Sequence, residues 1–172
     1  MKRIILVYGL IAGLIVTLSM LVAIGSGVHS IVLGYLSMLV ALSMVFVGIK
    51  RYRDEQLGGV IRFWPAMAVG LGISLIASLI YALGWEAYLY ATDYRFMPEY
   101  AASMIEARRA AGASAAEIAQ MQAEMDGFIR SYENPLVRLL YTFSEIAPVA
   151  LIVTLIAAAL LRRPGFLPAR AR

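Results

Sequence analysis

The chain alternates long apolar stretches that carry no charge with shorter polar segments. The first stretch, residues 4–49, contains no Asp, Glu, Lys or Arg. As a single helix it would be about 69 Å long, whereas the hydrocarbon core of a bilayer is about 30 Å thick. Residues 25–30, Gly-Ser-Gly-Val-His-Ser, offer the turn chemistry that this stretch requires. We therefore predict two membrane spans, about 4–24 and about 31–49, joined by a short loop.

Two further uncharged or nearly uncharged stretches follow, at 63–85 and 139–161. Trp64 and Trp85 are separated by about 31.5 Å of helix, and amphipathic rings of this kind favour the two membrane interfaces. Glu145 and Pro148 interrupt the last stretch, which still indicates a helix because membrane spans tolerate proline. We predict spans at about 64–90 and about 136–161, with a turn at the glycine pair 58–59.

A polar segment at 92–135 separates the third and fourth spans and has a helical pattern of its own. A helix is predicted from Pro98 to about Ala111, with a break at Gly112. Ser114 and Glu117 have the spacing of a capping box, which marks the start of a second helix. Apolar side chains then recur every three or four residues, at Ile118, Met121, Met125, Phe128 and Tyr132. The segment therefore predicts an antiparallel helical hairpin.

Composition supports a membrane protein and excludes several functional classes. The chain has 172 residues, 62% of them apolar and 15% charged, against about 45–50% and about 25% in soluble domains. Neither a water-soluble domain nor a disordered chain fits these values. The absence of Cys and the single His29 exclude disulfides, thiolate metal sites and most Ser–His catalytic schemes. We expect an all-α protein that is not an enzyme and holds no metal and no cofactor.

Methionines of the polar segment are the one alternative metal signal. Thioethers select Cu(I), so the methionines at 97, 104, 121 and 125 suggest a copper site outside the cytoplasm. Packing is the favoured interpretation, because Met fills irregular cores and no His or Cys accompanies these residues.

The basic residues set the orientation of the spans. Most of them fall on one side of the predicted membrane: Lys2, Arg3, Lys50, Arg51, Arg53, Arg62, Arg162, Arg163, Arg170 and Arg172. The positive-inside rule makes this side cytoplasmic, with both chain termini. The fold we expect is an integral membrane four-helix bundle with an extracytoplasmic helical hairpin, about 92–135, between spans three and four. The net charge of +4 thus reflects orientation and does not indicate nucleic-acid binding. A cleaved signal peptide is a less favoured alternative, because the first apolar stretch is longer than a signal peptide needs.

Glu145 is the most informative polar residue, because it lies within a predicted span, about 9 Å below the outer interface. A charge near the bilayer centre costs about 2.5–3.5 kcal/mol on insertion scales, so the carboxyl should face the bundle, be paired or be protonated. Hydroxyl groups at similar depth suggest an intramembrane polar cluster around it, formed by Tyr141, Tyr81, Tyr35, Ser37 and Ser78. The alternative is that Glu145 only locks helix packing.

Other polar and small residues carry more local predictions. Glu86 and Arg138 lie near the outer ends of spans three and four and are candidates for an ion pair. Lys50, Arg51 and Arg53 follow the second span and can contact anionic lipid headgroups. Small residues repeat at every fourth position at Gly9-xxx-Gly13 and from Gly70 to Ser78, a pattern typical of close helix contacts. The pattern does not distinguish contacts within the chain from contacts between copies.

Residues 33–85 resemble a known bacterial membrane family. The similarity rests on Gly34-Tyr35, on the run Gly48-Ile49-Lys50-Arg51-Tyr52-Arg53-Asp54, and on Gly58-Gly59, Phe63, Gly70 and Ile80-Tyr81. These residues resemble the family called domain of unknown function 4199. The resemblance implies a four-span protein of the bacterial inner membrane and supplies no activity.

Two functional interpretations follow. The first is a non-enzymatic membrane scaffold or accessory subunit that binds a membrane or periplasmic protein through the outer hairpin. The alternative is a small oligomeric transporter or channel that uses the polar cluster of Glu145. The expected partners are therefore the lipid bilayer, a protein and further copies of the chain, and not nucleic acid. An intramembrane enzyme is least favoured, because we find no nucleophile with a base and no metal ligand set.

Overall fold

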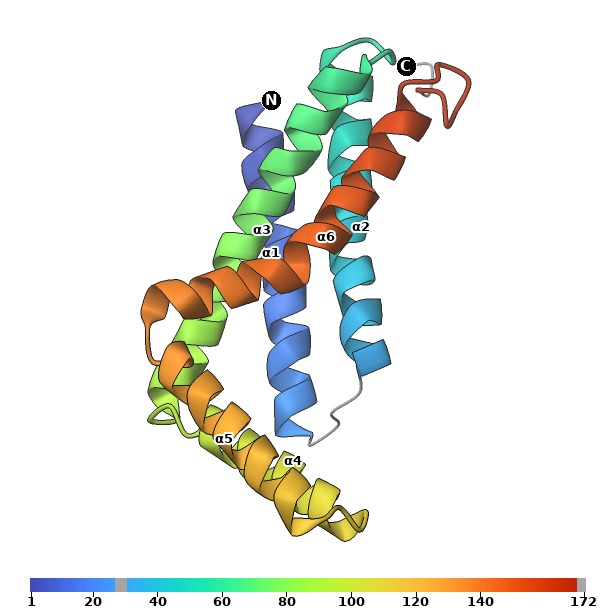
Figure 1. Cartoon of the computed structure of the whole chain (residues 1–172). Helices are drawn as coiled ribbons and strands as arrows, with labels where there is room; N and C mark the ends of the chain where they lie inside the picture. Colours follow the sequence, from blue (N-terminus) through green and yellow to red (C-terminus); the bar gives the residue numbers. More distant parts are fainter. Residues whose placement is uncertain (27–30, 170–172) are drawn as a thin grey trace. The chain divides into compact units, whose positions relative to one another are not determined.

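A computed structural model describes residues 1–26 and 31–169 of the chain, in which the regular secondary structure is helical. Within these residues it has six helices and no strand (Figure 1). They are α1 (Lys2–Gly25), α2 (Ile31–Gln56), α3 (Phe63–Ala91), α4 (Phe96–Ala110), α5 (Ala115–Tyr132) and α6 (Pro135–Leu161). His29 lies outside the described residues, as does the centre of the loop predicted between the first two spans.

The helices form two compact units. Unit 1 consists of Met1–Gly84 and Phe143–Arg172, and unit 2 of Trp85–Thr142. Unit 1 therefore contains α1, α2 and most of α3 and α6. Unit 2 contains α4 and α5 together with the last turns of α3 and the first turns of α6.

Four helices are long and apolar enough to cross a membrane. They are Lys2–Gly25, Val32–Gln56, Phe63–Ala91 and Pro135–Leu161. These helices overlap the four predicted spans, so the prediction of an all-α chain with four apolar helices of membrane-spanning length is confirmed. The predicted turn at 58–59 is present as well. Gly58 and Gly59 have φ values of 65° and 91°, which residues other than glycine rarely adopt.

The second helix is longer than the apolar pattern indicated. We expected the span to end near residue 49 and a loop to follow, but α2 continues to Gln56. In these extra turns Lys50 pairs with Asp54 and Arg51 pairs with Glu55, each four residues apart. Such pairs stabilise a helix after its apolar stretch has ended.

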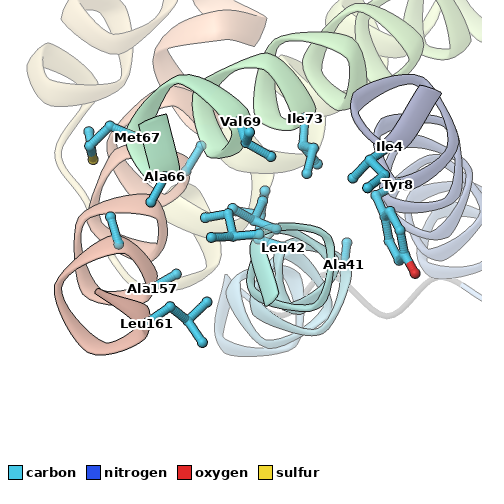
Figure 2. Close-up of a cluster of buried hydrophobic side chains, with 14 of the residues drawn as sticks. Ile4, Tyr8, Ala41, Leu42, Ala66, Met67, Val69, Ile73, Ala157 and Leu161 are labelled. Carbon is cyan, nitrogen blue, oxygen red and sulfur yellow. The ribbon is translucent and has the colours of Figure 1, made fainter. Parts of the chain in front are cut away.

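The core of unit 1 is made of small and aliphatic side chains from its four helices. Figure 2 shows part of it, with Ile4 and Tyr8 from α1, Ala41 and Leu42 from α2, Ala66, Met67, Val69 and Ile73 from α3, and Ala157 and Leu161 from α6. Lipid tails are as apolar as these residues, so close packing rather than escape from solvent holds such helices together in a membrane.

Glycines allow the closest approaches between the helices of unit 1. A Cβ added at Gly9 would lie 2.6 Å from the Cβ of Ile76, and one added at Gly13 would lie 2.7 Å from the Cβ of Ile80. Within α3, a Cβ at Gly70 would lie 2.5 Å from Cγ2 of Thr154 in α6. The small-residue patterns in α1 and α3 are therefore used inside one chain, which answers the question that the sequence left open.

One end of unit 1 brings together the N-terminus, the end of α2 and the segment after α6. The amino group of Met1 donates a hydrogen bond to Oε1 of Gln56 at 2.7 Å. The guanidinium group of Arg53 donates to the carbonyl oxygen of Phe166 at 2.9 Å, in the segment after α6. The N-terminus and the segment after α6 therefore both meet the last turns of α2.

In unit 2 the start of α5 is defined by its cap. The hydroxyl of Ser114 accepts a hydrogen bond from the backbone N–H of Glu117 at 3.3 Å, and the carboxylate of Glu117 accepts one from the N–H of Ser114 at 2.8 Å. The predicted capping box is therefore confirmed. These hydrogen bonds hold the pKa of Glu117 below its usual range. Gly112, with φ 85°, lies between α4 and α5 as expected.

Candidate functional site

Glu145 and Tyr81 form a polar contact within the span region of unit 1. The phenol of Tyr81 in α3 lies 3.5 Å from Oε2 of Glu145 in α6 and donates to it. This is the limit of hydrogen-bond distance, so the contact is weak. The Glu145 side chain is exposed on the surface of unit 1 and not enclosed among its helices. The carboxyl is thus partnered at an exposed position.

The other candidates for the polar cluster are placed differently. Ser78 is buried and donates to the carbonyl oxygen of Ser74 in its own helix at 2.8 Å. Ser37 in the same way donates to Gly34 at 2.8 Å, and Tyr35 is 52% exposed. Tyr141 belongs to unit 2, where its ring contacts those of Phe128 and Tyr132. The structure therefore brings Tyr81 to Glu145, whereas the two serines bond to carbonyls of their own helices.

A buried arginine connects three helix ends in unit 2. Arg138, in the first turns of α6, is 5% exposed. Its Nε and Nη2 donate to the two carboxylate oxygens of Glu86 at 2.9 and 2.5 Å. Its Nη1 donates to the carbonyl oxygens of Tyr132 and Glu133, just where α5 ends, at 3.0 and 2.9 Å. The candidate outer ion pair is thus present as a two-point contact, and it also binds the end of α5.

The turn between α3 and α4 is built around the same ion pair. Asp93 and Tyr94 have φ values of 50° and 54°, a left-handed conformation that is unfavourable for both residue types. The phenol of Tyr94 donates to Oε1 of Glu86 at 3.1 Å, and the guanidinium carbon of Arg138 lies 5.0 Å from its ring centroid. Burial, and after it the hydrogen bond to Glu86, raises the pKa of Tyr94. These contacts compensate for the strained backbone of the turn.

Aromatic rings complete the base of α4 and α5. The indole N–H of Trp85 donates to the phenol oxygen of Tyr132 at 2.7 Å, which joins α3 to the last turn of α5. The ring of Phe96, at the start of α4, meets Trp85 edge to face with centroids 4.9 Å apart. The sequence indicates that Trp85 marks a membrane interface. In the structure Trp85 also contacts both α4, through Phe96, and α5, through Tyr132.

A groove of about 550 Å³ lies between α4 and α5. It is lined by Met104, Ala107, Arg108, Ala111, Glu117, Gln120, Met121 and Glu124. The volume falls in the range of ordinary ligand sites, about 300–1,000 Å³. The two methionines and two alanines supply an apolar surface, and two carboxylates and one guanidinium group supply charge. Among the described residues, no group of three or more His, Cys, Asp or Glu side chains is placed to hold a metal ion.

The basic residues at the end of α2 divide into exposed and buried members. The side chains of Lys50 and Arg51 are 33% and 55% exposed, and each pairs with an acid four residues on. Arg53 is fully buried and donates to Asp54 at 2.7 Å. Its guanidinium group also donates to the carbonyl oxygens of Phe166 and Leu167. Contrary to our expectation, Arg53 therefore holds the C-terminal segment and is not available to lipid headgroups.

Comparison with known proteins identifies the family of the chain. A family model, described as "Protein of unknown function (DUF4199)", matches residues 7–163. The chain belongs to this family. The match covers unit 2 as well as the residues that carry the sequence resemblance. No match was found among curated proteins or among solved structures.

Proposed function

We propose that this DUF4199 protein is a non-enzymatic scaffold or accessory subunit of the bacterial inner membrane. In this proposal the groove between α4 and α5 binds a segment of a membrane or periplasmic protein. The observation that carries the proposal is the anchoring of both helices at their base. Arg138 binds the end of α5, and Trp85 contacts both Tyr132 and Phe96.

Anchoring supports a binding role because helices that are already ordered lose less conformational entropy when a partner binds. A loop that only links two spans needs no buried ion pair and no strained turn. Here the pair of Arg138 with Glu86 and the left-handed Tyr94 hold the base of α4 and α5 in one arrangement. Preorganised surfaces bind more tightly than mobile ones of equal area.

The lining of the groove indicates the chemistry of the partner. Met104 and Met121 offer flexible, polarisable contacts that suit varied apolar side chains. Two acidic side chains, Glu117 and Glu124, and one basic side chain, Arg108, line the groove, so the groove favours a positively charged segment. We infer a short partner segment that combines apolar and basic side chains.

The distribution of basic residues supports the placement in the membrane. Lys2, Lys50 and Arg163 belong to parts of unit 1 that meet at one end of the bundle, where Met1 contacts Gln56 and Arg53 contacts the segment after α6. By the positive-inside rule this end is cytoplasmic. The α4–α5 segment, whose acids outnumber its basic residues, then lies on the periplasmic side.

A small oligomeric transporter or channel is the second candidate, and the contact between Tyr81 and Glu145 is the observation that favours it. Acidic side chains within membrane spans often mark ion pathways or proton relays. Under this alternative, Glu145→Gln abolishes proton-linked solute flux in reconstituted vesicles, whereas changes in the α4–α5 groove leave that flux intact.

The proposed function is tested by comparing two variants after affinity purification from native membranes. Met121→Asp places a charge in the groove, and Ala102→Asp places the same charge on an exposed position of α4 outside it. We expect a stoichiometric partner with the unchanged chain and with Ala102→Asp, and its loss with Met121→Asp. A partner that remains bound to both variants, or a chain that always purifies without a partner, contradicts the proposal.

A further inference from the structure

The surface of α6 in unit 1 has two distinct parts. Towards the end of the helix the exposed side chains are large and aliphatic: Leu151, Ile152, Leu155 and Ile156. Before them lie Ser144, Glu145, Ala147 and Pro148, which are exposed as well. The aliphatic part suits lipid tails, whereas the preceding part presents small side chains around a carboxyl group.

The depth of Glu145 follows from the contact at the end of α6. The carbonyl oxygen of Leu161 accepts a hydrogen bond from Nη1 of Arg53, which places the two residues at one level. Glu145 precedes Leu161 by sixteen residues, or about 24 Å of helix, within the hydrocarbon thickness of about 30 Å. An exposed carboxyl at this depth faces lipid unless another protein surface covers it. Acids in membrane spans are rare and nearly always have a protein partner.

We propose that this surface is the contact between two copies of the chain, related by a two-fold axis that passes close to Glu145. The proposal rests on unit 1 alone and is independent of the function proposed for α4 and α5.

Self-complementary chemistry favours a second copy as the occupant. A two-fold interface places each residue near its own equivalent, so the central group must both donate and accept. A protonated carboxyl does both, and two of them pair through reciprocal O–H···O hydrogen bonds. Tyr81 donates to Oε2 of Glu145. This oxygen keeps a second lone pair that can accept from the other chain, while Oε1 carries the proton that is donated.

Small side chains beside Glu145 allow the required approach. Ser144 and Ala147 are exposed one turn apart, and small residues at such spacing let helix backbones come close in a membrane. The other small-residue patterns do not compete for this role. Gly9 and Gly13 are already packed against α3, and Gly70 is packed against α6.

The absence of Cys from the natural sequence permits a direct crosslinking test in native membranes. Ala147→Cys places a thiol beside the proposed axis, about 21 Å from Leu161 along α6. Val40→Cys is the matched control, because Val40 is 58% exposed on α2 and lies about 20 Å from Arg53. We expect oxidation to give a dimer of the 18.8 kDa chain with Ala147→Cys, and little dimer with Val40→Cys.

Changes at Glu145 separate a contact between chains from a role within one chain. Glu145→Leu should weaken self-association about tenfold, the scale of a few hydrogen bonds between helices in a membrane. Glu145→Gln should retain the dimer, because an amide also donates and accepts. Tyr81→Phe removes the contact inside the chain and should leave the Ala147→Cys crosslink in place.

Three results would overturn the proposal. They are equal crosslinking at Ala147→Cys and Val40→Cys, an unchanged dimer with Glu145→Leu, and a crosslink that forms only to a protein of different mass. If Glu145→Leu does not accumulate in membranes, Ala147→Trp blocks the contact at an exposed position and leaves Glu145 unchanged. Energy transfer between labelled chains should then fall to the level of non-interacting proteins, and undiminished transfer refutes the interface.

Discussion

Replacement of Arg138 by Met tests whether the base of α5 is held as the structure indicates. Arg138→Met keeps the apolar stem of the side chain and removes the guanidinium group. The change deprives the carbonyl oxygens of Tyr132 and Glu133 of their donor. It also leaves the carboxylate of Glu86 without its two-point partner.

The expected loss of stability follows from the burial of the two charged groups. Removal of one member of a fully buried ion pair costs about 3–5 kcal/mol. Here the side chain of Arg138 is 6% exposed but that of Glu86 is 39% exposed, so solvent recovers part of the loss. We expect about 2–3 kcal/mol for opening of the last turns of α5, which corresponds to about 30-fold to 150-fold more frequent opening.

Hydrogen exchange of the full chain in a lipid nanodisc measures this opening directly. Amides in the last turns of α5 should exchange about 30-fold to 150-fold faster in Arg138→Met. Arg109→Met is the matched control, because Arg109 pairs with Glu106 but both side chains are largely exposed, at 56% and 69%. Exposed pairs contribute little, so α5 should exchange as before. Equal exchange in Arg138→Met and the unchanged chain would refute the anchoring role.

Three further changes probe other parts of the structure. Gly70→Ala should destabilise unit 1 by about 1–3 kcal/mol in thermal unfolding in detergent, because its Cβ would overlap a side chain of α6, whereas Gly34→Ala meets open space. Ser114→Ala should speed exchange in the first turn of α5 about fivefold. The cap should also weaken at acid pH, because the pKa of Glu117 is lower in the folded chain than in the unfolded chain. The ionised carboxylate therefore stabilises the cap fully above the unfolded-state pKa, and this stabilisation is lost as the pH falls through the folded-state pKa. Arg53→Met should expose the segment after α6 to protease.

Each of these expectations has a clear contrary result. Equal melting temperatures for Gly70→Ala and Gly34→Ala would show that α3 and α6 do not approach as closely as described. A first turn of α5 that keeps the same protection from exchange in Ser114→Ala, or the same protection relative to the intrinsic exchange rate at all pH values, would contradict the capping box. A C-terminal segment that remains protected in Arg53→Met would show that other contacts hold it.

Local chemistry made much of the fold predictable. Four apolar stretches of sufficient length predict four helices whatever their partners are, and all four are present. Ser114 and Glu117 define the start of α5 without help from distant residues, because the two residues of the capping box are only three positions apart in the sequence. The turn at Gly58 and Gly59 likewise depends on backbone conformation alone.

Long-range contacts explain what the sequence did not reveal. Arg53 was assigned to the membrane surface because of its charge, although it continues a buried spacing through Val45 and Ile49 along α2. Its acceptors, the carbonyl oxygens of Phe166 and Leu167, lie more than a hundred residues away. The four-residue spacing of Val45, Ile49 and Arg53 is the sequence signal that could have predicted the burial of Arg53. The sequence did not show the carbonyl oxygens that accept hydrogen bonds from its guanidinium group, and burial without them would leave the charge without acceptors in the segment after α6.

The orientation of Glu145 could not be predicted for a different reason. The residues of α6 are apolar on nearly every face of the helix. The periodicity of the sequence therefore does not distinguish the face that packs against α3 from the face that meets lipid. The exposure of Glu145 and the burial of Ile146 therefore emerge only once the four helices are packed.

The account depends most on the α4–α5 surface facing the compartment opposite the chain termini. Because the chain contains no Cys, single cysteines report its sidedness without background. Ala102→Cys lies on an exposed position of α4, and Leu57→Cys lies in the exposed turn after α2. Intact spheroplasts treated with a membrane-impermeant maleimide should label Ala102→Cys at once, and Leu57→Cys only after permeabilisation. Labelling of Leu57→Cys from outside, with Ala102→Cys protected, would contradict the account.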